Sequence, residues 1–162
     1  MHEIRRVGPE AADDAVSILR EAARRVAERG IDVWTTDELR AADFAAAASA
    51  GELYLGYTGL EAVATMLLQT VDLVYWPQAE PGTALYVHKV AVRRSAAGCG
   101  WLRRLIDYAA GEAVARGVPF LRLDTLEGPT LRCLYEGLGF AALMEPPIQV
   151  RGRRLIRMER RL

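Results

Sequence analysis

The stretch that decides the fold runs from residue 85 to residue 117 and reads LYVHKVAVRRSAAGCGWLRRLIDYAAGEAVARG. Its first part, residues 85–92, is rich in β-branched and aromatic side chains, which predicts a strand. Apolar residues recur at helical spacing over residues 101–116, which predicts a helix. Gly98 and Gly100 lie in the turn between the two elements. This order is typical of a phosphate-binding site, because glycine lets the backbone approach a ligand and the first N–H groups of a helix face an anion.

Two common phosphate-binding motifs do not fit this turn. Dinucleotide-binding proteins use Gly-x-Gly-x-x-Gly after a strand, and nucleotide-hydrolysing proteins use Gly-x-x-x-x-Gly-Lys-Ser/Thr. Residues 97–104 read AGCGWLRR and match neither pattern. We therefore expect a phosphorylated ligand of another class.

The turn instead resembles the acetyl-CoA motif of the GCN5-related N-acetyltransferase (GNAT) family, Arg/Gln-x-x-Gly-x-Gly/Ala after a valine-rich strand. The matching segment, residues 97–102, reads AGCGWL. Gly100 matches the central glycine, and Gly98 stands where the family often has another. Ala97 replaces the usual Arg or Gln, and Leu102 replaces the usual small residue.

Two further segments are similar to this family. Residues 131–140 read LRCLYEGLGF, which resembles the family's short helix ending in Tyr-Glu-x-Leu-Gly-Phe. Residues 30–34 read GIDVW, similar to a Gly-Ile-x-x-Trp segment in a bacterial subgroup. The resemblance spans nearly the whole chain.

Length and composition favour one folded domain. The chain has 162 residues, of which 51% are hydrophobic and 26% charged, so it can bury about 70% of the surface that the unfolded chain exposes. We expect residues 1–162 to form a single GNAT-like α/β domain with the element order β-α-α-β-β-β-α-β-α-β-β. In the family this order builds a mixed sheet whose fourth and fifth strands splay apart around the pantetheine arm of the cofactor. The expected strands are residues 3–7, 52–58, 61–71, 85–92, 119–124, 140–143 and 151–161, and the expected helices are 9–29, 37–49 capped by Thr36, 101–116 and a short helix from Leu131.

Charge and hydropathy argue against several partners. The formal net charge is zero, which argues against nucleic-acid or anionic-membrane binding. We interpret the arginine-rich residues 151–161 as a strand with a solvated face. No apolar run is long enough to span a membrane and no secretory signal is evident, so a cytoplasmic location is expected. Cys99 and Cys133 lack metal-ligand spacing and are expected to be free thiols. The C-terminal edge strands are compatible with a homodimer.

The resemblance implies a mode of acetyl-CoA binding through main-chain groups. Arg93 and Arg94 either contact the remaining phosphate or are solvated, and Gly128 stands where many relatives have asparagine. The residues implied in cofactor binding are Val90, Ala91, Val92, Ala97, Gly98, Cys99, Gly100, Trp101, Leu102 and Gly128.

The resemblance also implies direct transfer of acetyl to an amine, with no covalent enzyme intermediate and no metal. Tyr135 occupies the position of the tyrosine that protonates the CoA thiolate in many relatives. The alternative is a packed aromatic on a short helix. Reference pKa values of about 10 for a phenol and 8.5 for a thiol make this transfer uphill by roughly 2 kcal/mol. His88, with an ordinary pKa near 6.5, is a candidate general base. The alternative is a core histidine bonded to a neighbouring strand or helix.

Aromatic residues indicate the acceptor class. Trp34 and Trp76 fall in loops that overhang the acceptor side in this fold, and Tyr86 shares a strand face with His88. We expect these three aromatic residues to bind a small-molecule amine or amino-acid-like acceptor. Two alternatives stay open: a non-catalytic acyl-CoA-binding module, motivated by the departures from the motif, and a protein or peptide N-acetyltransferase.

Overall fold

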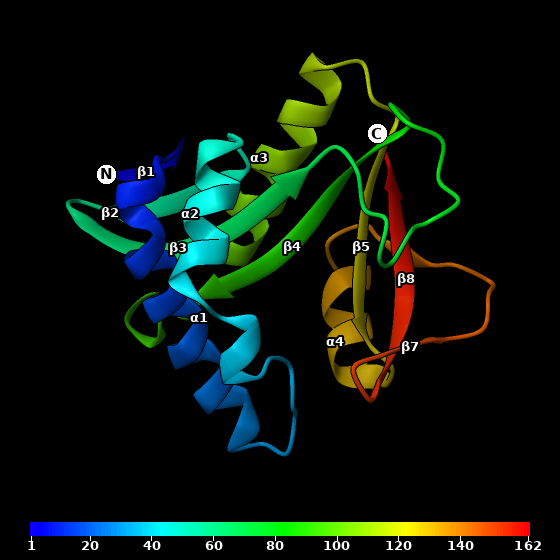
Figure 1. Ribbon diagram of the computed structural model, residues 1–162, viewed down its shortest axis with the longest axis horizontal. Coiled ribbons are helices and arrows are strands. Elements are labelled where there is room, and N and C mark those ends of the chain that lie inside the picture. Colours follow the sequence, from blue (N-terminus) through cyan, green and yellow to red (C-terminus); the bar gives the residue numbers. More distant parts are fainter. The chain divides into compact units, whose positions relative to one another are not determined.

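The computed structural model describes residues 1–162, and it contains two compact units. Unit 1 comprises Met1–Leu68 and Lys89–Leu105, and unit 2 comprises Gln69–His88 and Ile106–Leu162. Strand β4 (Ala84–Val92) begins in unit 2 and ends in unit 1 (Figure 1).

Unit 1 combines antiparallel strands with two helices. Strand β1 pairs with β2, and β2 pairs with β3, both antiparallel. Helices α1 and α2 lie side by side (Figure 1). The elements are β1 (His2–Arg6), η1 (Pro9–Ala11), α1 (Ala12–Ala27), η2 (Thr36–Glu38), α2 (Ala41–Ser49), β2 (Leu53–Thr58), β3 (Glu61–Gln69), the end of β4, η3 (Arg94–Ala96) and the start of α3 (Trp101–Ala115).

The core of unit 1 follows from the apolar face of α1. Ile18 and Leu19 of this helix are fully buried and belong to one cluster with Phe44 of α2 and Leu53 and Leu55 of β2. Apolar residues spaced three and four apart place these side chains on one helix face, where they cover the strands.

A close approach between β2 and the start of α3 completes unit 1. The Trp101 side chain is 1% exposed, and a Cβ added to Gly56 would lie 2.4 Å from its Cζ3 atom. The His2 ring meets the indole edge-on, with ring centroids 5.2 Å apart. Only glycine leaves room for the indole at position 56, so this residue fixes where α3 begins.

Unit 2 is organised around β5 and β8. Strand β5 runs parallel to β4 over three residue pairs, from Ala84 and Phe120 to Tyr86 and Arg122, and antiparallel to β8 along its whole length. Strands β6 and β7 both pair with β8, and the sheet order is β1-β2-β3-β4-β5-β8-β6. The remaining elements are β5 (Phe120–Leu126), α4 (Pro129–Glu136), β6 (Ala141–Ala142), β7 (Ile148–Val150) and β8 (Arg153–Arg161).

The predicted mixed α/β fold is confirmed, but the predicted helix over residues 37–49 begins too early. Thr35, not Thr36, caps a short 3-10 helix, because its N–H donates to the Glu38 carboxylate at 2.8 Å in a capping box. Arg40 then adopts an extended conformation, so α2 starts only at Ala41.

The C-terminal part holds one strand more than expected. The predicted strand over residues 151–161 is wrong at its start, because Arg151 and Gly152 have φ of +51° and +77° and form the turn of a β7–β8 hairpin. Its arginines are not simply solvated: Arg157 pairs with Glu145, and Arg160 lies 3.3 Å from Asp107.

The structure also bears on the expectations for the two cysteines and for a membrane-spanning segment. Both cysteines, Cys99 and Cys133, are free, as predicted, and both are exposed. None of the helices combines the length and the apolar character needed to cross a membrane.

The Gly56–Trp101 contact predicts a large cost for a single methyl group. Gly56→Ala is expected to lower the free energy of unfolding by about 1–3 kcal/mol, because the indole must shift to admit the Cβ. The control is Gly111→Ala in α3, where a Cβ meets no atom within 4 Å and a gain of about 0.5–1 kcal/mol is expected. Urea denaturation measures both, and equal effects of the two substitutions would contradict the proposed role of Gly56.

Candidate active site

The glycine turn of unit 1 presents main-chain donors. Gly98 and Gly100 have φ of +78° and +77°, the left-handed region that favours glycine. A Cβ at either residue would meet no protein atom within 4 Å. The Arg104 N–H donates to the Gly100 carbonyl at 3.1 Å, so the N–H groups before it in the first turn of α3 lie outside the helical ladder. These groups and the helix dipole favour an anion.

Helix α1 holds the residues that lead into this turn. The Glu21 carboxylate accepts the Arg94 N–H at 2.6 Å and the Arg93 Nη1 at 2.9 Å. The Arg94 bond is the main reason that the pKa of Glu21 is lowered, and the Arg93 charge adds to it against the effect of burial. Arg93 also donates to the Ala62 carbonyl at 2.9 Å and to Ser17 Oγ at 3.2 Å. Its guanidinium is therefore occupied by the protein, unlike either alternative considered for it from the sequence.

A third residue of α1 continues the same row of contacts. Arg25 follows Glu21 by one helical turn, and its Nη2 donates to the Val92 carbonyl at 3.2 Å. Ser17, Glu21 and Arg25 thus place one face of α1 along Val92–Arg94. We call these three residues the α1 clamp.

The alternation of side chains between the two faces of strand β4 is interrupted at Lys89. Lys89 has φ of +52°, so the two-residue period that relates Tyr86 to His88 does not continue to the residues after Lys89. The Lys89 ammonium lies 5.2 Å from the centre of the Trp34 ring. Trp34 is half-buried and packs against the core of unit 1.

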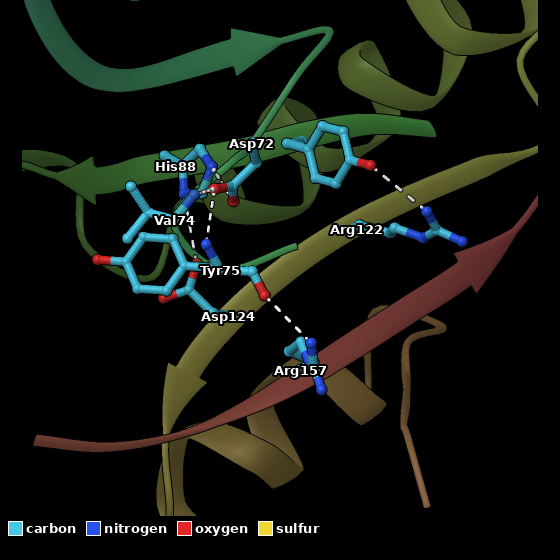
Figure 2. A network of polar contacts seen from close by, with 8 residues as sticks. Asp72, Val74, Tyr75, His88, Arg122, Asp124 and Arg157 are labelled. Atoms are coloured by element: carbon cyan, nitrogen blue, oxygen red, sulfur yellow. Dashed lines mark hydrogen bonds and ion pairs between the residues drawn. The ribbon is translucent and has the colours of Figure 1, made fainter. Parts of the chain in front are cut away.

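The main ionisable cluster lies in unit 2. His88 Nε2 is 3.0 Å from Asp72 Oδ2, and His88 Nδ1 is 3.4 Å from Asp124 Oδ1. The three side chains are only 14%, 4% and 13% exposed for His88, Asp72 and Asp124. Figure 2 shows both carboxylates directed toward the imidazole ring. The loop before β4, β4 itself and β5 each contribute one of these residues.

The two carboxylates control the protonation of the histidine. Burial alone lowers the pKa of His88, but hydrogen bonding and charge from Asp124 and Asp72 outweigh it and raise this pKa to about 9. Burial raises the pKa of Asp72, yet the interactions with His88 and with two backbone N–H groups bring it below its ordinary value. His88 is therefore an imidazolium at neutral pH.

Local backbone geometry fixes Asp72. Its Oδ1 accepts the N–H groups of Val74 at 3.1 Å and Tyr75 at 2.9 Å, the arrangement that makes aspartate common in turns. The Tyr75 ring lies against His88 with centroids 5.8 Å apart, and Arg157 donates to the Tyr75 carbonyl (Figure 2).

Tyr135 lies on α4 of unit 2. It is half-buried, and its ring meets Phe140 edge-on at 6.0 Å. Burial, with a smaller contribution from the Asp124 charge, raises the pKa of Tyr135 to about 12. The phenol thus stays protonated over the physiological range. Gly128 caps the start of α4 with φ of +133°.

Two of the aromatic residues that were predicted to bind the acceptor are buried. Trp76 and Tyr86 are 6% and 3% exposed and share one hydrophobic cluster of unit 2. The guanidinium of Arg122 lies 4.8 Å from the Trp76 ring centre and 3.4 Å from the Tyr86 hydroxyl. Their side chains are core, so any role in binding would be indirect.

Sequence reasoning missed Asp124 and Glu21. Asp124 carried a usable signal, since it is the one acidic residue of a strand that reads FLRLDTL. Glu21 carried none, because its partner Arg94 is 73 positions away. The remaining predicted residues divide between the units: Val90–Val92 and residues 97–102 belong to unit 1, and His88, Gly128 and Tyr135 to unit 2.

Comparison with known proteins identifies the fold. No protein-family model and no curated protein match the sequence. A GNAT-family acetyltransferase from Streptococcus agalactiae matches with a TM-score of 0.81 at 19% identity, over 99% of this chain and 95% of its own. A GNAT-family acetyltransferase from Listeria monocytogenes matches with 0.77 at 20% identity, over 99% and 95%. PaiA N-acetyltransferase from Thermoplasma acidophilum, in complex with coenzyme A, matches with 0.76 at 11% identity, over 100% and 99%.

The charge of His88 predicts a pH-dependent stability. Because its folded pKa of about 9 exceeds the ordinary value, its contribution is fully present below about pH 6.5 and is lost as pH rises toward 9. The free energy of unfolding should fall by up to about 3 kcal/mol over this range. Asp124→Asn should reduce that fall, and Asp107→Asn should not. Urea denaturation at pH 6 and 9.5 measures this, and a pH-independent wild type would contradict it.

Proposed function

We propose that this chain, which has the fold of the GNAT acetyltransferases, is an N-acetyltransferase that moves the acetyl group of acetyl-CoA to the amine of a small acceptor. The observation that carries the proposal is the glycine turn before α3, with main-chain donors at a helix start and open space beside both glycines. PaiA N-acetyltransferase has the same fold and was solved with coenzyme A.

Main-chain groups would carry most of the cofactor binding. The N–H groups of Gly98, Gly100, Trp101 and Leu102 would bind the pyrophosphate, whereas the Cys99 N–H already donates to the Ala96 carbonyl at 3.3 Å. Val90–Val92 would pair with pantetheine as an added strand. Trp101 can contribute only its backbone, because its indole is buried in unit 1. Ala97 offers no side-chain donor, so we expect weaker binding than in relatives with Arg or Gln there.

The proposed reaction is a direct attack. The neutral amine nitrogen attacks the thioester carbonyl carbon, a C–N bond forms, and the C–S bond breaks as the thiolate leaves. The thiolate takes a proton from Tyr135, and the acceptor nitrogen gives up one proton to neutral His88. Exchange with solvent then returns a proton to Tyr135 and removes one from His88, and the products are an amide and free CoA. With a phenol pKa of about 12, transfer to a thiolate of pKa 8.5 is uphill by about 5 kcal/mol, more than reference values imply.

His88 would act as the base only in its neutral form. Since its pKa is about 9, the fraction of neutral imidazole grows as pH rises toward that value. The amine must lose a proton before it can attack, so turnover should favour alkaline conditions.

A second candidate function is an acyl-CoA-binding module without turnover. The missing side-chain donor at Ala97 favours it, because a weakened cofactor site is consistent with lost catalysis. Such a module would bind acetyl-CoA but release no thiol with any amine.

Substitution of two glycines with the same backbone strain tests the cofactor site. Gly100→Val is expected to raise the Kd for acetyl-CoA at least about ten-fold, because the side chain occupies the cofactor's approach and perturbs the donors. Gly152 has the same φ of +77° and the same open surroundings. Gly152→Val should therefore introduce a similar backbone strain of about 1–2 kcal/mol and leave the affinity for acetyl-CoA unchanged. Calorimetric titration measures both, and equal losses would reject the turn as the binding site.

Removal of the Tyr135 hydroxyl separates the two candidate functions. For an acetyltransferase, Tyr135→Phe should lower kcat about 10²–10⁴-fold while the Kd for acetyl-CoA changes less than about two-fold. Thiol release with a panel of small amines measures kcat in the wild type and the variant. Binding without thiol release from the wild type would favour the second candidate.

A further inference from the structure

Glu21 of the α1 clamp is an acidic residue at the start of a turn that is proposed to bind a diphosphate. Its carboxylate accepts the Arg94 N–H at 2.6 Å and the Arg93 Nη1 at 2.9 Å. Arg94 precedes Gly98, the first left-handed glycine of the turn, by only four residues. A carboxylate near an anion site opposes binding if charge is all that it contributes. The position of Glu21 therefore indicates a different contribution.

The charge of Glu21 is balanced by neighbouring arginines. The Arg94 hydrogen bond is the main cause that lowers the pKa of Glu21, and the charges of Arg93 and Arg25 act in the same direction, against the effect of burial. The side chains of Arg93 and Glu21 are only 18% and 30% exposed, so water screens this ion pair less than a surface pair. Glu21 is thus ionised at neutral pH, and the two arginines offset its repulsion of an anion.

The Glu21 carboxylate caps the short helix that leads into the glycine turn. Arg94 is the first residue of η3, and the opening N–H groups of a helix have no partner inside it. Arg93, the residue before η3, does not cap it with its own side chain. The Ala97 N–H then donates to the Arg94 carbonyl at 3.1 Å, one residue before Gly98. Glu21 therefore adds the first hydrogen bond to a series that runs up to the turn.

Strand β3 holds the other side of the same junction. The Arg93 N–H donates to the Val63 carbonyl at 2.7 Å, and the Arg93 side chain donates to the Ala62 carbonyl at 2.9 Å. Arg93 is thus held by β3, whereas the Arg94 N–H is held by α1. Because this N–H belongs to the peptide unit between the two residues, the Glu21 bond sets the orientation of that peptide where the chain leaves β4.

We propose that Glu21 is a positioning residue of the cofactor site, which raises the affinity for acetyl-CoA by ordering the turn although its own charge opposes the ligand. The inference rests on the proposed function, because the role it assigns is toward the cofactor. An ordered turn loses less conformational entropy when a ligand binds to it. Positioning and charge therefore predict opposite signs: removal of Glu21 weakens binding in the first case and strengthens it in the second.

Calorimetric titration of the full-length protein with acetyl-CoA tests this sign. Glu21→Ala should raise the Kd about ten-fold, the effect of losing one charge-assisted hydrogen bond. Glu21→Gln should stay within about three-fold of the wild type, because its amide oxygen still accepts the Arg94 N–H. The matched control is Glu112→Ala, which should leave the Kd unchanged. Glu112 is 31% exposed and pairs at 2.8 Å with Arg116 of the same helical segment.

Amide hydrogen exchange, measured by NMR on the free protein, tests the ordering itself. In Glu21→Ala, the amides of Arg94 and Ala97 should exchange at least about five-fold faster than in the wild type, and Glu112→Ala should not change them. A folded variant of lower global stability keeps its Kd, so weaker binding together with faster exchange at these two amides separates positioning from a general loss of stability. If Glu21→Ala does not fold, Glu21→Asp replaces it. This variant keeps the charge but is one methylene shorter, so it should weaken binding where Glu21→Gln does not.

Several outcomes would overturn the inference. They are an unchanged or lower Kd in Glu21→Ala, equal losses in Glu21→Ala and Glu112→Ala, unchanged exchange at Arg94 and Ala97, or wild-type affinity in Glu21→Asp. Absence of acetyl-CoA binding by the wild type would reject the proposed function and this role of Glu21 together. Wild-type binding that Glu21→Ala leaves intact would reject only the role of Glu21.

Discussion

A buried cluster of ionisable groups is the constraint on which unit 2 depends. Two carboxylates with side chains no more than 13% exposed face one histidine. Burial removes these groups from water, and this desolvation disfavours the charged form of each one. The cluster is stable only if attraction among its members offsets that cost. This attraction raises the pKa of His88 and lowers the pKa of Asp72. The cluster joins the loop after β3, β4 and β5, so the same electrostatics that set the protonation of His88 also hold these three segments together.

In unit 1, polar contacts between α1 and the start of the glycine turn hold that turn in position. A turn with two left-handed glycines is intrinsically mobile, because glycine has the largest backbone freedom to lose. The α1 clamp reduces that freedom where the turn begins, since Glu21 binds both the backbone and the side chain of successive residues. Trp101 fixes the other side by packing on Gly56. The donors of the turn are therefore positioned by contacts at both of its ends.

The sequence predicted the elements around β4 and α3 well because their signals are local. Apolar periodicity and the paired glycines specify a strand, a turn and a helix without reference to the rest of the chain. Features that need a remote partner were not predictable in this way. Trp76 was predicted to be a loop aromatic that binds the acceptor, yet it is buried, and arginines from strands β5 and β8 lie against its ring. The choice between Thr35 and Thr36 as a cap depended on one side-chain bond, and the three residues of β7 were too few to show a period.

One departure from the motif, Ala97, has a physical consequence for the proposed cofactor site. Ala97 has no side chain that could contact the cofactor. A longer side chain at this position would lose conformational entropy on binding, whereas backbone donors that the fold already holds in place would not. Clamping the turn through Glu21 and packing it through Trp101 both act on backbone positions. Affinity that a long side chain at position 97 would supply is thus exchangeable, in part, for rigidity that helix α1 supplies here. The loss of cofactor affinity caused by Ala97 is therefore smaller than the free energy of one charge-assisted hydrogen bond, because the backbone donors that remain are already in place.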